Sequence, residues 1–368
     1  MMAKSWFLRT TKSIIIIINL FVGIIYLIAA LSPYINPNTW WVHGFLALIT
    51  PYLILTLILF ILFWLISRPK WALISIIVLC IGYKQLPVVF AWSGDSGFIK
   101  RKSENSFRIA DWNVQSFIGL TKNTAAKKGI RVEVAESILK NNPDIICLQE
   151  FNSAKSENNI ILFSKTHPYY YFSKDYHLTQ SDYQSGCIIF SKYPVIDSGK
   201  IEFPNAESLI YIDILKGTDT LRIFTTHLQS FKFKKDDYEN IEKLKASENT
   251  SITANKSLIR KMKFAYQKRG IQTDMVQKAL NESPYPSVIC GDFNDVPNSY
   301  TYFNIRQDWQ DAFLKKDFGI GRTFISIAPT LRIDYILAGN QFEIKQFDMI
   351  DEALSDHIML LADIRLKK

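Results

Sequence analysis

Two long uncharged apolar runs near the N-terminus constrain this chain more than any other feature. Residues 13–31 (SIIIIINLFVGIIYLIAAL) and 45–66 (FLALITPYLILTLILFILFWLI) contain no acidic or basic residue. Each run is long enough to cross a bilayer, which takes about 20 apolar residues. A second complete span follows the first, which favours a permanent span over a cleavable signal peptide. The sequence therefore predicts a membrane anchor at its N-terminal end.

A third apolar run, residues 71–91, is less regular. It is interrupted at Lys84 and then resumes as LPVVFAW. A tilted span and a re-entrant or interfacial segment both fit this pattern. We predict that residues 1–92 form an anchor with three transmembrane helices, at about 13–31, 45–66 and 71–91.

The positive charges in the short loops predict the orientation of these spans. The loop 32–44 has no Lys or Arg, whereas the N-terminal tail and the loop 67–70 contain Lys4, Arg9, Lys12, Arg68 and Lys70. Positively charged loops stay in the cytoplasm. With three spans in the inner membrane, the domain after Trp92 would be extracytoplasmic. With only two spans it would be cytoplasmic, and the basic residues 100–102 weakly favour that alternative.

The remaining composition is that of an ordinary folded domain with a basic balance. The formal net charge is +9. Such a charge suits a polyanionic partner, either nucleic acid or an anionic membrane surface, although a solvated basic face explains it equally well. The four cysteines form no CxxC pair. Neither a zinc site nor a disulfide framework is therefore indicated, and buried thiols are favoured.

Strand and helix signals alternate after a polar linker at residues 93–106. We predict a single catalytic domain over residues 107–368, of the α/β class. Helices are predicted at 127–140 and 252–281, and a polar insertion covers 231–268. Strands are predicted by short apolar runs at 107–112, 144–148, 186–190, 209–215, 221–226, 287–291, 333–337 and 358–364.

Polar side chains stand where several of these strands end. The segments concerned are Asp111-Trp112-Asn113, Gln149-Glu150, Thr225-Thr226-His227, the GDFND run at 291–295, Arg332-Ile333-Asp334 and Ser355-Asp356-His357. Oxygen-rich clusters of this kind suit Mg²⁺ or Mn²⁺. Each segment alone has a plain structural explanation. GDFND could be a turn, and Asp334 could simply pair with Arg332. Their joint occurrence favours chemistry on a phosphoester.

The order of these motifs resembles that of the endonuclease/exonuclease/phosphatase superfamily. The resemblance covers residues 107–366 and rests on WNV, DIICLQE, GCIIFSKYPV, THL, GDFND, RIDYIL and SDH. It implies a four-layer α/β sandwich with two central, mostly antiparallel sheets. It also implies a metal-assisted attack of water on a phosphodiester or phosphomonoester. Carried over by position, the Mg²⁺ or Mn²⁺ ion would be bound by Glu150, with Asn113 beside it and Asp356 as a further ligand.

The resemblance also implies five catalytic residues. Asp292 would orient or deprotonate the water, and Asn294 would hold the phosphate. His357, steered by Asp334, would contact the phosphate or transfer a proton. His227 would stabilise the transition state or assist the leaving group. Loss of one such group typically costs about 10²–10⁴-fold in rate.

The substrate is not determined by these motifs. Tyr183-Gln184-Ser185 do not match the pattern expected of a DNA-cutting member, and Arg322 is a candidate phosphate contact or an ordinary surface residue. Three functions remain open: a membrane-anchored phosphodiesterase acting on a lipid headgroup or another phosphoester, a nuclease acting on DNA or RNA, and a catalytically silent binding module. The expected partners are the phosphoester and the lipid bilayer, with no obligate protein partner.

Overall fold

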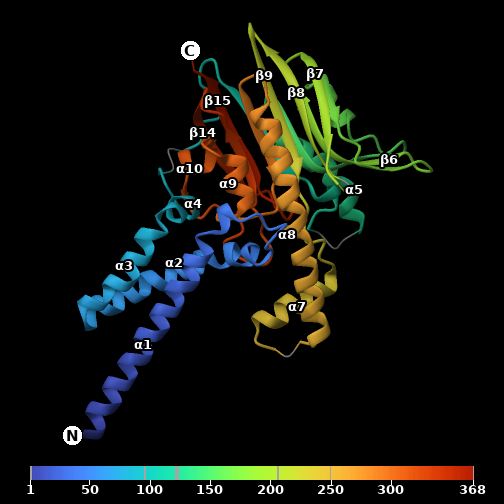
Figure 1. The fold of residues 1–368 in the computed structure, drawn as a ribbon. Helices are drawn as coiled ribbons and strands as arrows, with labels where there is room; N and C mark the ends of the chain where they lie inside the picture. Colours follow the sequence, from blue (N-terminus) through green and yellow to red (C-terminus); the bar gives the residue numbers. More distant parts are fainter. Residues whose placement is uncertain (1, 95–96, 121–123, 205–206, 249, 368) are drawn as a thin grey trace.

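A computed structural model describes residues 2–94, 97–120, 124–204, 207–248 and 250–367. Two β-sheets pack face to face at the centre, and helices cover the outer face of each sheet (Figure 1). A group of long apolar helices projects from one end of this sandwich. The arrangement confirms the predicted four-layer α/β fold.

The first sheet has seven strands in the order β14-β15-β2-β3-β6-β4, with β5 also paired to β6. Only β2 and β3 run parallel; the other pairs are antiparallel. The strands are β2 (Phe107–Asn113), β3 (Ile145–Ser153), β4 (Tyr169–Phe172), β5 (Tyr176–Leu178), β6 (Tyr183–Ser191), β14 (Phe342–Ile350) and β15 (Met359–Leu366).

The second sheet has six strands in the order β11-β13-β10-β9-β8-β7. Here β9 and β10 are the parallel pair. The strands are β7 (Val195–Glu202), β8 (Ser208–Lys216), β9 (Asp219–His227), β10 (Ser287–Asp292), β11 (Gln310–Asp311) and β13 (Asp334–Ala338). Because each sheet contains only one parallel pair, the prediction of mostly antiparallel sheets is correct.

The main core lies between the two sheets. It contains Ile109 and Ile189 from the first sheet and Ile212 and Ile223 from the second. The outer layers are α5 (Thr124–Leu139) and α6 (Ile161–Ser164) on the first sheet, and α8 (Ile252–Asn281) and α9 (Tyr300–Arg306) on the second. Strands β2 and β10 are buried along their whole lengths. Coverage on both faces explains why β10 contains a continuous apolar run, 288–290, rather than an alternating pattern. In β2 the buried Arg108 and Asp111 instead form side-chain hydrogen bonds, with Asp363 and Gln149 respectively.

The cysteines only partly match the expectation of buried thiols. Cys147, Cys187 and Cys290 are buried between the sheets. Cys80 is exposed, because it lies on the outer surface of the anchor helix α3 (Ala72–Ile81).

The N-terminal region is helical and strongly apolar. It comprises α1 (Met2–Ala29), α2 (Val42–Ser67), α3 and α4 (Leu86–Val89). Two segments, Thr10–Tyr34 and Val42–Ser67, are long and apolar enough to cross a membrane. The third run is divided into Pro69–Ile81 and Tyr83–Val89, which are bent by 69° relative to each other. This pair can count as a third span only if the bent segment crosses as one unit.

The anchor packs directly against the second sheet's helical layer. Helix α2 approaches α8 so closely that a Cβ on Gly44 would lie 2.3 Å from a ring carbon of Tyr266. The Asn36 amide donates to a carboxylate oxygen of Asp274 at 2.9 Å. These contacts join residues far apart in the sequence and hold α2 beside α8.

The polar insertion forms a projecting arm. We use this name for residues 234–248, which contain α7 (Lys235–Lys245), and for the N-terminal half of α8 (Ile252–Asn281), residues 252–266. The arm extends from the body on the same side as α1, α2 and α3 (Figure 1). Helix α8 begins at Ser251, whose hydroxyl caps the helix by accepting from the Ala254 amide at 3.1 Å. The insertion is therefore an ordered element next to the anchor.

Candidate active site

A cavity of about 470 Å³ opens where strand ends of the two sheets meet. The carboxyl ends of the parallel pairs β2–β3 and β9–β10 lie at this rim. Strands β13 and β15 run antiparallel to β10 and β2, so their amino ends lie there as well. This topology explains why residues that follow some strands and precede others come together at one place.

Glu150 and Asn113 come from the first sheet. Glu150 has a φ of 51°, at a point where the β3–β6 register shifts between Leu148 and Phe151. Such a bulge re-aims a side chain out of the ladder. The Asn113 amide nitrogen lies 3.3 Å from Glu150 Oε1 and 3.1 Å from Asp292 Oδ2. Asn113 therefore links a carboxylate of one sheet to a carboxylate of the other.

The GDFND run is not the simple turn that its composition allows. Gly291 lies within β10 with a φ of 143°, and a Cβ there would be 2.2 Å from the Thr226 carbonyl oxygen. The glycine is needed for close strand contact. Asn294, with a φ of 53°, donates its backbone N–H to Asp292 Oδ1 at 2.8 Å and its amide to the Leu228 carbonyl at 2.9 Å. The run thus fixes both Asp292 and Asn294.

His357 is held by Asp334. Its Nδ1 lies 2.9 Å and 3.0 Å from the two carboxylate oxygens. The alternative pairing of Asp334 with Arg332 is wrong, because Arg332 donates to Asp311 at 2.6 Å instead. Burial lowers the pKa of His357, but the carboxylates of Asp334 and Asp292 outweigh it and raise the pKa to about 10. The imidazole is therefore a cation with its Nε2 3.8 Å from Asp292 Oδ2.

His227 approaches the same carboxylates from β9. Its Nε2 lies 3.6 Å from Asp292 Oδ2 and 3.8 Å from Glu150 Oε1. Burial lowers the pKa of His227, but the nearby carboxylates of Glu207, Asp292 and Glu150 outweigh it, so the pKa is raised. The carboxylates thus shift both imidazoles toward the charged form, which suits a negatively charged reactant.

The cavity contains several carboxylates, and burial together with their mutual repulsion raises the pKa values of two of them. Burial, reinforced by the Asp334 charge, raises the pKa of Asp292 to about 6. Burial and the Glu150 charge also raise the pKa of Asp356. Glu150, Asp292 and Asp356 line the same cavity, and the Asn113 amide nitrogen lies 3.3 Å from Glu150 Oε1. A divalent cation would relieve this repulsion, and oxygen donors are those that Mg²⁺ and Mn²⁺ prefer. The donor set therefore fits such an ion.

Eight of the nine residues singled out from the sequence gather here. Six of them line the cavity: Glu150, His227, Asp292, Asn294, Asp356 and His357. Asn113 and Asp334 are buried against these six. Arg322 is the exception. It does not line this cavity, and its Nε donates to the Phe324 carbonyl at 3.0 Å.

Several residues of the site carry no recognisable signal in the sequence. Glu207 is a single acidic residue before a strand, yet its charge acts on His227. Gln149 does stand in one of the predicted polar segments, but its hydrogen bonds to Asp111 at 2.7 Å and to Thr225 at 3.0 Å, which join the sheets below the cavity, could not be predicted from that position. Leu48 lines the cavity although it belongs to an apolar anchor helix. Leu48 belongs to the site only because of the residues that surround it in the folded structure.

Comparisons with known proteins agree with this geometry. Residues 112–357 match the model of the Endonuclease/Exonuclease/phosphatase family, and residues 12–89 match a domain of unknown function (DUF8431). No curated protein sequence matches the chain.

Three solved structures share the fold at low sequence identity. An endonuclease/exonuclease/phosphatase protein from Beutenbergia cavernae has 17% identity and a TM-score of 0.50, with 72% of each chain covered. The human Nocturnin catalytic domain has 16% identity and a TM-score of 0.50, with 73% of this chain and 97% of that chain covered. A humanized TDP2 from D. rerio has 16% identity and a TM-score of 0.50, with 71% and 100% covered. Together with the family match over residues 112–357, the fold and the site lead to one conclusion: this chain belongs to the endonuclease/exonuclease/phosphatase family.

Proposed function

We propose that this chain is a divalent-metal-dependent hydrolase that cleaves phosphoester bonds, in particular phosphodiesters, at a membrane surface. The family typically comprises metal-dependent phosphoesterases. The observation that carries the proposal is the convergence around one cavity of two imidazoles, whose pKa values are raised by nearby carboxylates, and several buried carboxylates. Neither a structural core nor a simple binding surface requires charged groups to be buried in this way.

Glu150 and Asp356 would hold the metal ion in this proposal. When bound, Mg²⁺ or Mn²⁺ would supply a Lewis acid that withdraws negative charge from the phosphate oxygens. Asn113, as it lies here, directs its amide nitrogen to Glu150 and Asp292, while its oxygen accepts from the Gln115 amide at 3.0 Å. Amide orientation is assigned from the surrounding hydrogen bonds. Asn113 therefore positions the two carboxylates. If its side-chain amide were rotated by 180°, the oxygen instead of the nitrogen would face Glu150 and could bind the ion.

Asp292 would accept a proton from the attacking water. The water oxygen forms a bond to phosphorus, and the ester P–O bond on the opposite side breaks. His227 would donate a proton to the leaving alkoxide, so that water adds across the broken bond. His357, with Nδ1 held by Asp334, presents Nε2 to the phosphate oxygens, and the second N–H of the Asn294 amide would do the same.

A substrate panel tests this proposal. The full-length protein is expected to hydrolyse bis(p-nitrophenyl) phosphate, to lose that activity with EDTA, and to regain it when Mg²⁺ or Mn²⁺ is added in excess. The panel also includes oligonucleotides and phospholipid vesicles. Higher kcat/KM on oligonucleotides would favour the nuclease alternative. Activity that EDTA leaves unchanged would refute the metal-dependent mechanism, and inactivity on every phosphoester would leave the silent binding module.

The catalytic domain is proposed to lie outside the cytoplasm, with the chain crossing the inner membrane three times. The junctions at residues 30–41 and 90–92 lie at the domain, whereas the N-terminus and the loop with Arg68 and Lys70 lie at the far ends of the helices (Figure 1). Positive charges therefore gather on the side opposite the domain. Alkaline phosphatase fused after Lys102 is expected to be active. Activity of a cytoplasmic reporter at the same position would contradict the three-span topology.

A further inference from the structure

The active-site cavity adjoins a second cavity, which we call the apolar groove. The apolar groove has a volume of about 490 Å³ and lies between α2, the arm and the loop 327–331. It shares five lining residues with the active-site cavity: Leu48, Phe231, Phe233, Ile327 and Leu331. The two cavities are therefore neighbours, one with charged residues in its lining and the other lined almost entirely by apolar ones.

The lining of the apolar groove suits a hydrocarbon chain. Its walls include Ile49 of α2, Ile241 of α7 and Met262 of α8. The polar atoms on its walls pair with neighbouring protein groups: Tyr52 Oη lies 3.3 Å from Thr330 Oγ1, and Asn255 Oδ1 accepts from Thr250 at 3.0 Å. A phosphate or another charged group placed there would lose its hydration without a partner.

The position of the apolar groove suits a chain that comes from a bilayer. One wall is α2, which is long and apolar enough to span a membrane. The opposite wall is the arm, which exposes Leu244, Ile252 and Ile259, with exposed fractions of 45%, 73% and 47%. Apolar side chains mixed with Lys and Arg are typical of surfaces that lie in the headgroup region.

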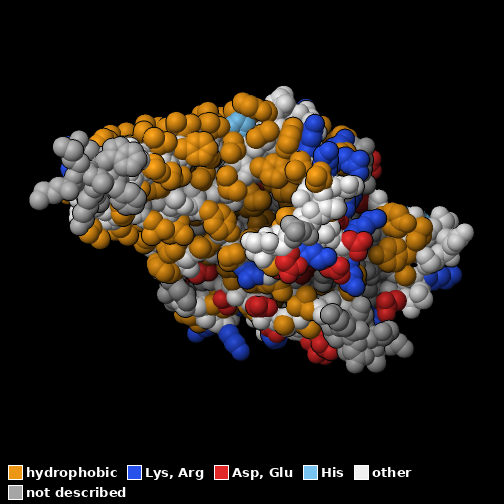
Figure 2. Space-filling view, turned by 90° about the horizontal axis from the view of Figure 1, so that it is seen from below, with side chains coloured by type: hydrophobic (Ala, Val, Ile, Leu, Met, Phe, Trp, Pro, Cys, Tyr) orange, Lys and Arg blue, Asp and Glu red, His pale blue; other side chains and the backbone are white. Residues whose placement is uncertain are grey.

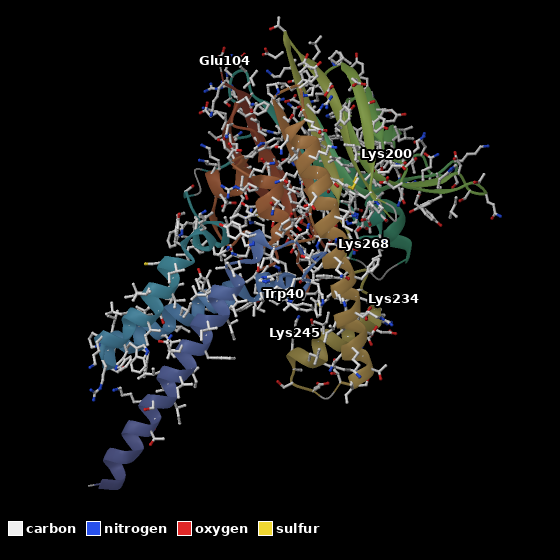
Figure 3. All side chains as sticks on the ribbon, in the orientation of Figure 1. Trp40, Glu104, Lys200, Lys234, Lys245 and Lys268 are labelled. Carbon is white, nitrogen blue, oxygen red and sulfur yellow. The ribbon has the colours of Figure 1, made fainter. Side chains whose placement is uncertain are left out.

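The figures show the same relation between the anchor and the arm. Lys234 and Lys245 lie on the arm below the body, and Trp40 lies between the anchor and α8 (Figure 3). Seen from below, hydrophobic side chains cover the side of α1, α2 and α3, and charged side chains gather on the other side (Figure 2). The apolar groove lies between α2 and the arm, so one of its walls belongs to the apolar helices.

The walls of the apolar groove are held in place. Gly44 allows α2 to contact Tyr266 of α8, and the ring of Phe45 packs against the same tyrosine at 5.3 Å between centroids. A groove formed by fixed walls needs little reorganisation to bind a ligand.

We propose that the apolar groove binds an acyl chain of a membrane phospholipid while the phosphoester of that lipid lies at the active site. This inference rests on the proposed function and names its substrate class. Transfer of a chain from the bilayer to the groove would cost little, because both surroundings are apolar. For an amphiphile taken from water, each buried methylene contributes about 0.8 kcal/mol, which is about fourfold in affinity.

A series of n-alkyl phosphates tests the groove independently of any headgroup. Butyl, hexyl and octyl phosphate would compete with bis(p-nitrophenyl) phosphate on the full-length protein in a fluorinated surfactant, which mixes poorly with hydrocarbon. The inhibition constant is expected to fall about fourfold per methylene. Ala328→Trp, which fills the groove, should abolish this chain-length dependence and leave hydrolysis of the short substrate unchanged. Ala246→Trp places the same side chain on the arm outside the groove and should behave as the wild type.

A second variant and a direct binding measurement distinguish a failure of the groove proposal from a failure of the proposed function. Ile259→Asp changes the groove wall at a half-exposed position, so the fold should tolerate it, and it should also weaken octyl phosphate. Calorimetry of octyl phosphate with the unsubstituted protein reports binding without turnover. Chain-length-dependent binding without hydrolysis of any phosphoester would support the groove and refute the proposed function. Hydrolysis with equal inhibition by all three alkyl phosphates, or tighter inhibition by oligothymidylate than by octyl phosphate, would overturn the lipid proposal.

Discussion

Replacing Asp292 by Asn is expected to lower kcat/KM by about 10²–10⁴-fold on every phosphoester that the protein hydrolyses. The variant keeps the shape of the side chain and an oxygen that can accept from the Asn294 backbone N–H, but an NH2 group replaces the oxygen that accepts from the Asn113 amide. It cannot accept the proton of the attacking water. The free-enzyme pKa of about 6 places this carboxyl near the pH at which a general base works best. Steady-state rates on bis(p-nitrophenyl) phosphate, with Mg²⁺ at saturation, would measure the loss.

The pH profile of the wild type provides a second measure of the same residue. Only the ionised Asp292 can act as a base, so kcat/KM should rise with pH through the pKa of Asp292 in the active enzyme. A bound cation favours the ionised form, so that this limb should lie at or below about pH 6. The residual activity of Asp292→Asn should lack the limb. A profile that is identical in both proteins would contradict the assignment.

The Asp292→Asn substitution should lower the activity but leave the Tm unchanged or raise it. The folded-state pKa of Asp292 is raised above its ordinary value of 3.8, so the ionised carboxylate costs stability at neutral pH when no metal is bound. In EDTA, Asp292→Asn should therefore have a Tm equal to or above that of the wild type. Asp308→Asn, at an exposed carboxylate, serves as the matched control and should change neither quantity. A large fall in Tm of Asp292→Asn would attribute its inactivity to misfolding.

The central strands could be predicted from the sequence because their burial leaves a simple pattern. Strand β10 is covered on both faces and appears as a short apolar run, and β2 is equally covered although it also contains buried Arg108 and Asp111. The edge strand β7 was not predicted, since it is largely half-exposed and its sequence, VIDSGKIE, mixes polar and apolar residues. Other unpredicted strands, among them β4, β5, β11 and β14, also lie at or near sheet edges. Edge strands of this kind are only partly buried, so their side chains show no clear apolar pattern from which a strand can be predicted.

The candidate site could be predicted as far as its members follow or precede buried strands. His227 and Asp292 end neighbouring strands, so their proximity follows from the sheet. Arg322 lies in a loop, and its neighbours depend on contacts that no local pattern encodes. The contribution of Leu48 could not be predicted either, because Leu48 reaches the cavity only through the packing of α2 on α8. Sequence periodicity identified α2 as apolar but could not show that its first turns belong to the site.

The N-terminal apolar helices also bear on the stability of the α/β sandwich, because Arg332 contacts both parts of the molecule. Arg332 is 1% exposed. It donates to Asp311 at 2.6 Å and to the Val88 carbonyl of α4 at 3.1 Å. Its guanidinium also lies 4.8 Å from the ring centre of Phe313. One side chain therefore joins the last anchor helix to the second sheet beside Asp334.

Arg332→Met is expected to destabilise the protein by about 3–5 kcal/mol, because it leaves the Asp311 carboxylate buried without its partner. For a domain of this size the Tm should fall on the order of 10 °C. The double variant Arg332→Met/Asp311→Asn removes the uncompensated charge, while Asn can still cap α10 (Ala312–Lys316), where Asp311 now accepts from the Leu314 amide. The double variant should therefore recover most of the loss in thermal unfolding. If both variants have the same Tm, well below that of the wild type, the charge pair with Asp311 is not what stabilises the contact. The hydrogen bond to Val88 and the packing of the guanidinium would then hold the N-terminal helices to the sandwich.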